Sequence, residues 1–315
     1  MALFIPYIIV FSFDISISKH LEKIQRFPAD NEIWNDIYKS RINSEYIILG
    51  SSRAWVHISP KIITENLHTS AYNLGEDGSN ILRQYLRFKE YINYNIHPNK
   101  IILNVDIYSL TRSTFPQYHY YPYMLLNTRI LRLLNELGYN EFNKVDFLVP
   151  LIRYLRPKYL VGHIFNKEIQ PILLGDKQAY LFKDVPQYID ENGCFRQEGY
   201  RGIDAPLKID TSVSDIVMEI DPFMIDLLDR FIAEIKANKI DLVLVWTPEL
   251  ISGQDVCLNR KEIDSVFSHM ALKYEVPYYN YSDSAISKDS NLFYNVEHLN
   301  KEGSEKFTSL LIKKL

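Results

Sequence analysis

Short apolar runs alternate with longer segments of helical periodicity along this chain, and this alternation constrains the fold more than any other feature. We interpret five such runs as buried strands, at residues 46–49, 71–74, 101–105, 242–246 and 276–279. After the second run, apolar residues recur at helical spacing at Ile81, Tyr85 and Phe88. Strands that alternate with helices pair in parallel through right-handed crossovers. The sequence therefore predicts a doubly wound, flavodoxin-like α/β fold, with a five-stranded parallel sheet between two layers of helices.

The alternation breaks off after the third run. Turn signals such as Asn192-Gly193 and an aromatic cluster at residues 118–123 replace it. We interpret residues 107–221 as a large insertion after strand three, within one domain that spans residues 45–315. The aromatic side chains of this insertion could bind a sugar or face lipid, or they could pack as ordinary core and surface residues.

The amino-terminal segment differs in character from the rest of the chain. Residues 2–13 form an uninterrupted apolar run that ends at Asp14. A membrane-spanning helix needs about 20 apolar residues, so this run is short for a bilayer. We expect residues 1–19 to be a truncated N-terminal membrane anchor that associates with a membrane through residues 2–13, followed by a lead-in over residues 20–44. A helix or strand packed on the domain is the alternative.

The charge balance argues against nucleic acid as a partner. The chain has 35 Lys and Arg against 39 Asp and Glu residues, and it has no basic run that could follow a phosphate backbone. Its two cysteines, Cys194 and Cys257, lack the spacing of a zinc site, and they fit either one disulfide or two free thiols. No nucleotide-binding glycine motif occurs. We expect neither a metal nor an organic cofactor.

Two residues near the ends of the predicted domain could carry chemistry. Ser52 follows the first predicted strand in the sequence GSSRAW, where a turn into a helix would expose its hydroxyl and its backbone N–H. His298 precedes the last predicted helix in NVEHLN. A serine at such a turn is often only a helix cap, but it becomes a nucleophile when a base within about 3 Å takes its proton. Because loops after the strands of such a sheet meet at one edge, we predict that Ser52 and His298 form a reactive pair.

The turn around Ser52 resembles the first block of the SGNH (GDSL-like) hydrolase superfamily, in particular its membrane-anchored bacterial branch with a GSSR-type first block. Gly50-Ser51-Ser52 matches that block, with Ser52 at the position of the nucleophile. The family's second block contains a glycine whose N–H binds the oxyanion. The stretch NLGEDGSN offers Gly78 for this role, and Gly75 as a weaker match. The resemblance thus implies that the N–H groups of Ser52 and Gly78 form the oxyanion hole.

The segment around His298 resembles the family's last block, Asp-x-x-His-Leu-Asn with a glycine three residues on. Residues 295–300 and Gly303 match it, and His298 falls on the general base. Asn295 replaces the catalytic acid, and an amide can orient an imidazole but cannot stabilise an imidazolium by charge. Either Asn295 orients a Ser52–His298 dyad, or another carboxylate serves as the acid, at Asp106 or Glu297.

A second departure concerns the oxyanion hole and the residue that follows the nucleophile. The family's third block is absent, and Tyr108 falls roughly where its oxyanion asparagine would stand. Loss of one such donor typically costs about a hundredfold in rate. Arg53 could hold an anionic substrate, but we favour an ion pair with an acidic side chain.

The resemblance implies a serine-dependent acyl-ester hydrolase or acyltransferase. We expect Ser52, His298 and Asn295 to be its catalytic residues, and the substrate to be an acylated carbohydrate or another small ester. An O-acyl group of a cell-envelope polysaccharide is the expected target, reached by a membrane-anchored, extracytoplasmic protein of a bacterium. The alternative is a catalytically degenerate member of the fold that binds glycan or a partner protein in polysaccharide assembly.

Overall fold

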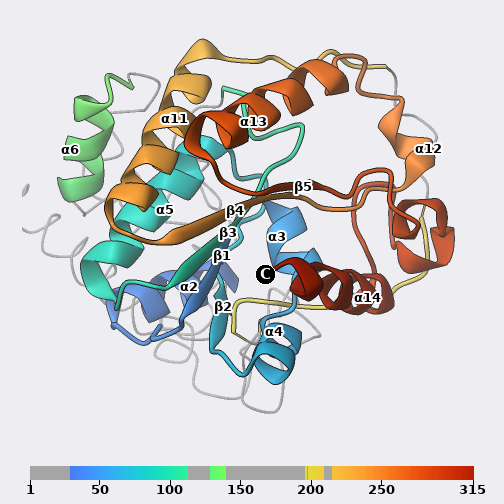
Figure 1. Ribbon diagram of the computed structural model, residues 1–315, viewed down its shortest axis with the longest axis horizontal. Helices are drawn as coiled ribbons and strands as arrows, with labels where there is room; N and C mark the ends of the chain where they lie inside the picture. The colour runs from blue at the N-terminus through green and yellow to red at the C-terminus, as the bar shows by residue number, and fades with distance from the viewer. Residues whose placement is uncertain (1–28, 113–127, 140–195, 197, 209–214) are drawn as a thin grey trace, which may run out of the picture. The chain divides into compact units, whose positions relative to one another are not determined.

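The computed structural model describes residues 29–112, 128–139, 196, 198–208 and 215–315 (Figure 1). The predicted anchor, the aromatic cluster and Cys194 lie outside these residues. The chain divides into two compact units, one of residues 36–112 and 196–315 and the other of residues 1–35 and 113–195. The first unit contains the whole sheet and every candidate site residue. No helix in the described part of the chain is long and apolar enough to cross a membrane.

The sheet has five parallel strands in the order β2-β1-β3-β4-β5. They are β1 (Tyr46–Leu49), β2 (Ala71–Asn73), β3 (Lys100–Asn104), β4 (Asp241–Trp246) and β5 (Tyr278–Asn280). This confirms the predicted fold class. The fifth strand begins two residues later than predicted, since Pro277 has no backbone N–H to donate to a ladder and only its carbonyl bonds to β4.

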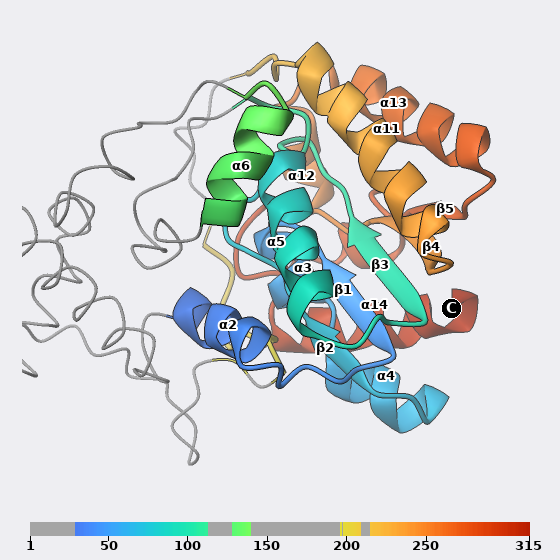
Figure 2. The same ribbon diagram turned by 90° about the vertical axis from the view of Figure 1, so that its left-hand side faces the viewer.

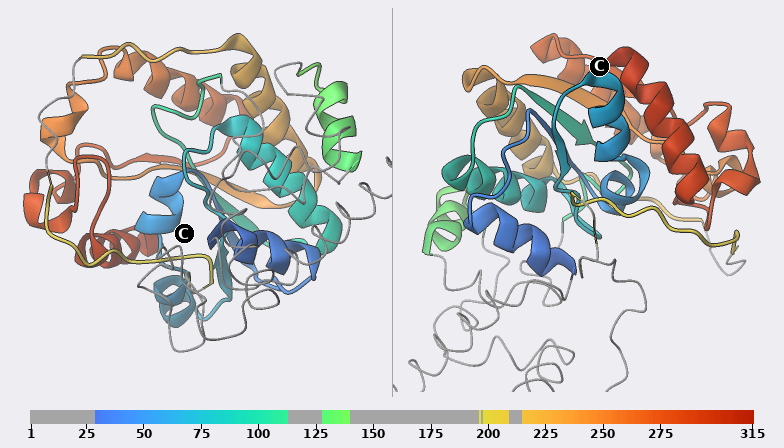
Figure 3. Two further views of the ribbon diagram at one scale, coloured as in Figure 1. Left: turned by 180° about the vertical axis from the view of Figure 1, so that it is seen from behind. Right: turned by 90° about the horizontal axis from the view of Figure 1, so that it is seen from below.

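Helices cover both faces of the sheet and form three layers with it (Figure 1). One face carries α5 (Ile81–Tyr94), α11 (Pro222–Ala237) and α13 (Arg260–Tyr274). The other face carries α3 (Ser52–His57), α4 (Pro60–Leu67) and α14 (Lys301–Leu311), with α14 beside the other two (Figures 2 and 3). The remaining elements are α2 (Ala29–Tyr38), α6 (Thr128–Glu136), α12 (Ile251–Gln254), η3 (Ile286–Lys288), η4 (Ser290–Leu292) and η5 (Ile312–Lys314).

The three central strands β1, β3 and β4 have apolar, buried interiors because helices cover both of their faces. On the side of α3 and α14, Ile48 and Ile102 belong to one buried cluster with Phe307 and Leu311. On the other side, the side chain of Phe231 in α11 is fully buried, and its ring centroid is 5.1 Å from that of Phe88 in α5. Burial on two sides thus explains why uniform apolar runs, and not alternating ones, predicted these strands.

The chain adds β2 on one side of β1, and then crosses to add β3, β4 and β5 on the other side. The order of strands therefore reverses between β1 and β3. Leu49 pairs with Leu103, and Asn104 pairs with Val245, so β1, β3 and β4 are in register at their carboxyl ends. In open parallel sheets, the crevice at such a reversal is where ligands bind. The residues that follow these strands are therefore the ones that can build a site.

Candidate active site

Gly50 turns the chain from β1 into α3 and so places Ser52. Its φ is +151°, and a Cβ atom there would lie 2.6 Å from Asn104 Cβ and 2.7 Å from Ala54 Cβ. A side chain would therefore clash with both neighbours, and only glycine fits. Ser51 caps α3, since its hydroxyl oxygen accepts the Arg53 N–H at 3.3 Å. Ser52 is the first helical residue, where backbone N–H groups have no acceptor within the helix.

The structure brings Ser52 and His298 together, as the sequence led us to expect. The hydroxyl oxygen of Ser52 lies 2.8 Å from Nε2 of His298. On the other side of the ring, Nδ1 lies 3.1 Å from Oδ1 of Asn295. The three side chains thus form a continuous chain of hydrogen bonds in the order Ser52, His298, Asn295.

Backbone donors determine which tautomer His298 adopts. The N–H groups of Glu297 and His298 approach the same Asn295 atom at 2.9 and 2.8 Å. Because a backbone N–H can only donate, that atom must be the amide oxygen. The oxygen cannot donate to Nδ1, so Nδ1 carries the proton. Nε2 therefore presents a lone pair to the Ser52 hydroxyl, which is the arrangement that a general base needs.

Burial and a neighbouring cation make the imidazolium form of His298 unfavourable. The pKa of His298 is lowered to about 3, chiefly by desolvation and also by the positive charge of Arg53, while Glu249 offsets part of this effect. Within the described part of the chain, no carboxylate contacts the ring. His298 is therefore neutral at pH 7 and able to accept a proton, but the cation formed in doing so lacks the support that an aspartate would provide.

Asp106 is not the partner of His298, which corrects one of the two alternatives for the acid. Its carboxylate accepts the Ser51 hydroxyl, the Tyr108 N–H at 2.9 Å and the Ser109 hydroxyl at 3.3 Å. The side chain is fully buried and is committed to these donors. Asp106 thereby links the turn after β3 to Ser51, the residue that precedes Ser52. Glu297, the other alternative, does not contact the ring nitrogens either.

Arg53 forms the ion pair that we expected, and its partner is Glu249. Nη1 of Arg53 donates to Glu249 Oε1 at 2.6 Å, and both side chains are at most 5% exposed. Glu249 also accepts Trp246 Nε1 at 2.7 Å and Arg260 Nη1 at 2.6 Å. Burial alone would raise the pKa of Glu249, but the two arginines lower it. The sequence analysis did not predict Glu249 as a site residue. Its position just after the fourth strand matches that of Asp106 just after the third, and this position could have identified it.

His57 is a second histidine that the sequence did not bring to notice. It is fully buried in α3, and its Nε2 accepts the Leu299 N–H at 3.0 Å. Nδ1 must then be the donor to Thr247 Oγ1, which lies 3.0 Å away. Burial lowers the pKa of His57 well below its usual value, with smaller contributions from His298 and Arg53. A neutral His57 thus fastens the loop that carries His298 to the helix that carries Ser52.

The two glycine candidates for the oxyanion hole have different environments. The Gly75 N–H donates to Asn73 Oδ1 at 2.9 Å, so it is already committed. Gly78 adopts a left-handed conformation with φ +59°, and its carbonyl accepts Arg83 Nη1 at 3.0 Å. Arg83 also pairs with the buried Glu76, so it joins two residues of the loop that contains Gly78. Gly75 is therefore the weaker candidate, and Gly78 stays the predicted oxyanion donor.

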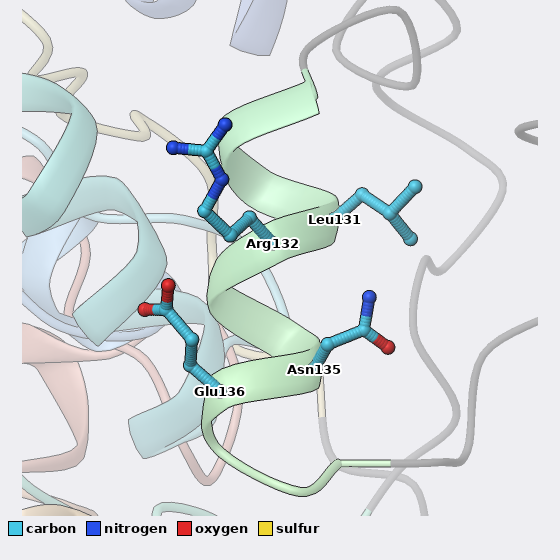
Figure 4. A pocket seen from close by; sticks show the side chains of 4 residues that line it. All are labelled: Leu131, Arg132, Asn135 and Glu136. Carbon is cyan, nitrogen blue, oxygen red and sulfur yellow. The ribbon is translucent and has the colours of Figure 1, made fainter.

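Two other features of the described residues concern metal ligands and a surface hollow. No group of three or more His, Cys, Asp and Glu side chains within the described ranges could hold a metal ion. A hollow of about 510 Å³ lies along α6, lined by Leu131, Arg132, Asn135 and Glu136. Figure 4 shows that Arg132 and Glu136 project from one side of the helix and Leu131 and Asn135 from the other. None of these four residues is a serine, threonine or cysteine.

No family model and no curated protein matches this chain. Solved structures that resemble it include a GDSL-like lipase from Bacteroides thetaiotaomicron, with 12% identity over 85% of this chain and 87% of that one and a TM-score of 0.37. A member of the lipolytic protein G-D-S-L family from Veillonella parvula has 10% identity, coverage of 85% and 96%, and a TM-score of 0.41. A catalytic mutant of an acetylxylan esterase from Geobacillus stearothermophilus has 7% identity, coverage of 87% and 95%, and a TM-score of 0.42. Likenesses at this level establish neither a family nor a function.

Proposed function

We propose that this chain is a serine-dependent acyl-ester hydrolase or acyltransferase. The observation that carries the proposal is the 2.8 Å contact between Ser52 Oγ and the unprotonated Nε2 of His298. A serine hydroxyl is a weak nucleophile until such a base takes its proton. The carboxyl ends of β1 and β3, where this pair lies, are also where a sheet of this topology binds ligands.

In the proposed reaction, Ser52 Oγ attacks the acyl carbonyl while His298 Nε2 takes the hydroxyl proton. The N–H groups of Ser52 and Gly78 stabilise the negative charge on the carbonyl oxygen. Nε2 then gives its proton to the departing alcohol, which leaves an acyl-serine. Water or a second hydroxyl attacks this ester, again with His298 as base, and frees Ser52. The choice between these two acceptors distinguishes a hydrolase from a transferase.

We further propose that the acyl group is carried by a cell-envelope polysaccharide and that residues 1–19 anchor the protein at a bacterial membrane. This part of the proposal depends on the resemblance of the sequence motifs to the membrane-anchored SGNH branch, and on the apolar run at residues 2–13. It is tested by fractionation of the producing cells and by assay of acylated envelope glycans.

The second candidate function is a binding protein that keeps the fold without turnover. One observation favours it: His298 is paired with an amide, and its pKa of about 3 makes it a weak base. Such a protein would still bind an acylated glycan at the same edge of the sheet, but its serine would not react.

Labelling with a fluorophosphonate separates the two candidates, because the reagent reports an activated serine without requiring the natural substrate. We expect the full chain to be labelled, Ser52→Ala to lose labelling completely and His298→Ala to lose most of it. Ser309→Ala is a matched control, since that exposed serine bonds, among the described residues, only to the Glu305 carbonyl of its own helix. An unlabelled parent protein at neutral to mildly alkaline pH would favour the binding protein.

A further inference from the structure

Tyr108 and Glu297 meet beside the reactive pair, although they come from different loops. Tyr108 follows β3, and its phenol hydroxyl donates to Glu297 Oε1 at 2.7 Å. Glu297 directly precedes His298, and its N–H donates to the same Asn295 oxygen that orients the imidazole. The contact therefore joins the loop after β3 to the loop of the base.

Tyr108 is tied to the nucleophile's side of the site in a similar way. Its backbone N–H donates to Asp106 Oδ1 at 2.9 Å, and the other oxygen of that carboxylate accepts the hydroxyl of Ser51. Ser51 immediately precedes Ser52. The pair of Tyr108 and Glu297 is thus held by groups that adjoin the nucleophile on one side and the base on the other.

A buried arginine lies close to both side chains. Arg53 is 2% exposed, and its Nη2 lies 3.6 Å from Glu297 Oε1. Its guanidinium carbon lies 5.6 Å from the centroid of the Tyr108 ring. Because Glu249 fixes the same guanidinium at 2.6 Å, Arg53 cannot easily move away. The position of the Tyr108–Glu297 pair is therefore set before any ligand arrives.

The side chains of Tyr108 and Glu297 are both partly exposed to solvent. Tyr108 is 37% exposed, one of the few large apolar side chains at the surface of the described residues, and the Glu297 side chain is also 37% exposed. The described residues offer no donor to Glu297 Oε2. An exposed aromatic ring therefore lies next to a carboxylate oxygen with free acceptor capacity.

We propose that Tyr108 and Glu297 form the subsite for the alcohol portion of the ester, and that this portion is a neutral, hydroxyl-rich sugar. The inference rests on the proposed function, since it names the substrate class of the same site. An aromatic side chain offers an apolar surface with a polar tip, which suits the C–H face of a sugar ring. A carboxylate accepts hydrogen bonds from sugar hydroxyls, and bonds to a charged acceptor are the stronger kind.

Charge and desolvation select against other alcohols. An acidic sugar would bring a second carboxylate close to Glu297, and like charges repel. A plain alkyl alcohol would cover Glu297 without offering it a donor, and a polar group left unpaired in this way is costly. A site of this chemistry therefore prefers a neutral sugar ester to either of them.

The test compares kcat/KM for methyl 6-O-acetyl-glucoside and for p-nitrophenyl acetate, whose leaving group has no sugar hydroxyls. We expect Glu297→Gln and Tyr108→Ala each to lower the ratio of the sugar ester to the nitrophenyl ester by about tenfold. The ratio cancels any effect on His298 that both substrates feel. Glu65→Gln is the matched control, because that exposed glutamate pairs with Lys61 in α4 and with no other described residue, and its ratio should equal that of the parent.

Binding of the same glucoside to the full chain carrying Ser52→Ala, measured by calorimetry, gives a readout that does not require turnover. We expect Glu297→Gln in this background to raise the Kd by about tenfold. A protein that reacts with fluorophosphonate but shows unchanged ratio and Kd in both variants would overturn the inference and leave the proposed function intact. A protein that is not labelled, yet binds the glucoside and loses this binding with Glu297→Gln, would overturn the proposed function and keep the subsite.

Discussion

Nδ1 of His298 donates a hydrogen bond to Oδ1 of Asn295 at 3.1 Å, and this amide occupies the place where a catalytic triad has a carboxylate. Two backbone N–H groups hold the amide oxygen in that direction. Asn295 therefore supplies the orienting function of the missing acid without its charge. The difference between orientation and charge can be measured.

Replacing Asn295 by aspartate should accelerate the reaction of Ser52. A carboxylate can accept the same three hydrogen bonds, and its charge stabilises the imidazolium that forms as Ser52 attacks. We expect the second-order rate constant of fluorophosphonate labelling to rise with the pKa of His298, by up to about tenfold for each unit, since proton transfer is only partial in the transition state. Asn295→Ala should lower the rate modestly, through loss of orientation. No gain in Asn295→Asp would mean that another group already supplies the charge.

The labelling rate should be insensitive to mild acid. The reaction requires neutral His298, and a pKa of about 3 keeps the ring neutral far below the usual imidazole range. The rate constant should therefore stay level from pH 7.5 to pH 5, whereas an ordinary histidine with a pKa near 6.5 would lose about thirtyfold at pH 5. In Asn295→Asp the acid limb should move to higher pH, since the carboxylate raises the pKa. A parent profile that falls with a midpoint near pH 6.5 would contradict this.

Removal of the Asp106 carboxylate should cost stability as well as activity. Asp106→Ala leaves the Ser51 hydroxyl and the Tyr108 N–H without an acceptor in a buried region, and we expect a loss of about 3 kcal/mol in the free energy of unfolding. Chemical denaturation monitored by fluorescence measures this. If Asp106 were instead the acid partner of His298, Asp106→Ala would abolish labelling while the unfolding midpoint stayed near that of the parent.

Acid should destabilise the fold through His57. The folded-state pKa of this histidine is depressed, so below pH 6.5 the unfolded chain binds a proton that the folded chain does not. Stability is therefore fully present above pH 6.5 and falls as the pH drops below it, by about 1.4 kcal/mol per pH unit for one such group. His57→Gln can still accept the Leu299 N–H, and its stability should fall less steeply between pH 6.5 and 5. Equal slopes for the two proteins in urea titrations would show that His57 does not carry this dependence.

The amino-acid sequence by itself determined the strands, the helices that separate them, and the positions of Ser52 and His298 in turns that lead into helices. These features depend on local signals: apolar runs, helical spacing and turn residues. The boundary of the fifth strand was two residues off because the backbone of Pro277 decides where a ladder can start.

The tertiary structure alone decided how the polar side chains of the site are paired. Arg53 and Glu249 are 196 positions apart, and Tyr108 and Glu297 are 189 apart, so no spacing in the sequence connects them. The sequence allowed Asp106 to be the acid partner of His298, but in the fold its carboxylate accepts the Ser51 hydroxyl. Buried polar groups must all find hydrogen-bond partners at once, and which donor meets which acceptor depends on the distances that packing of the whole domain imposes.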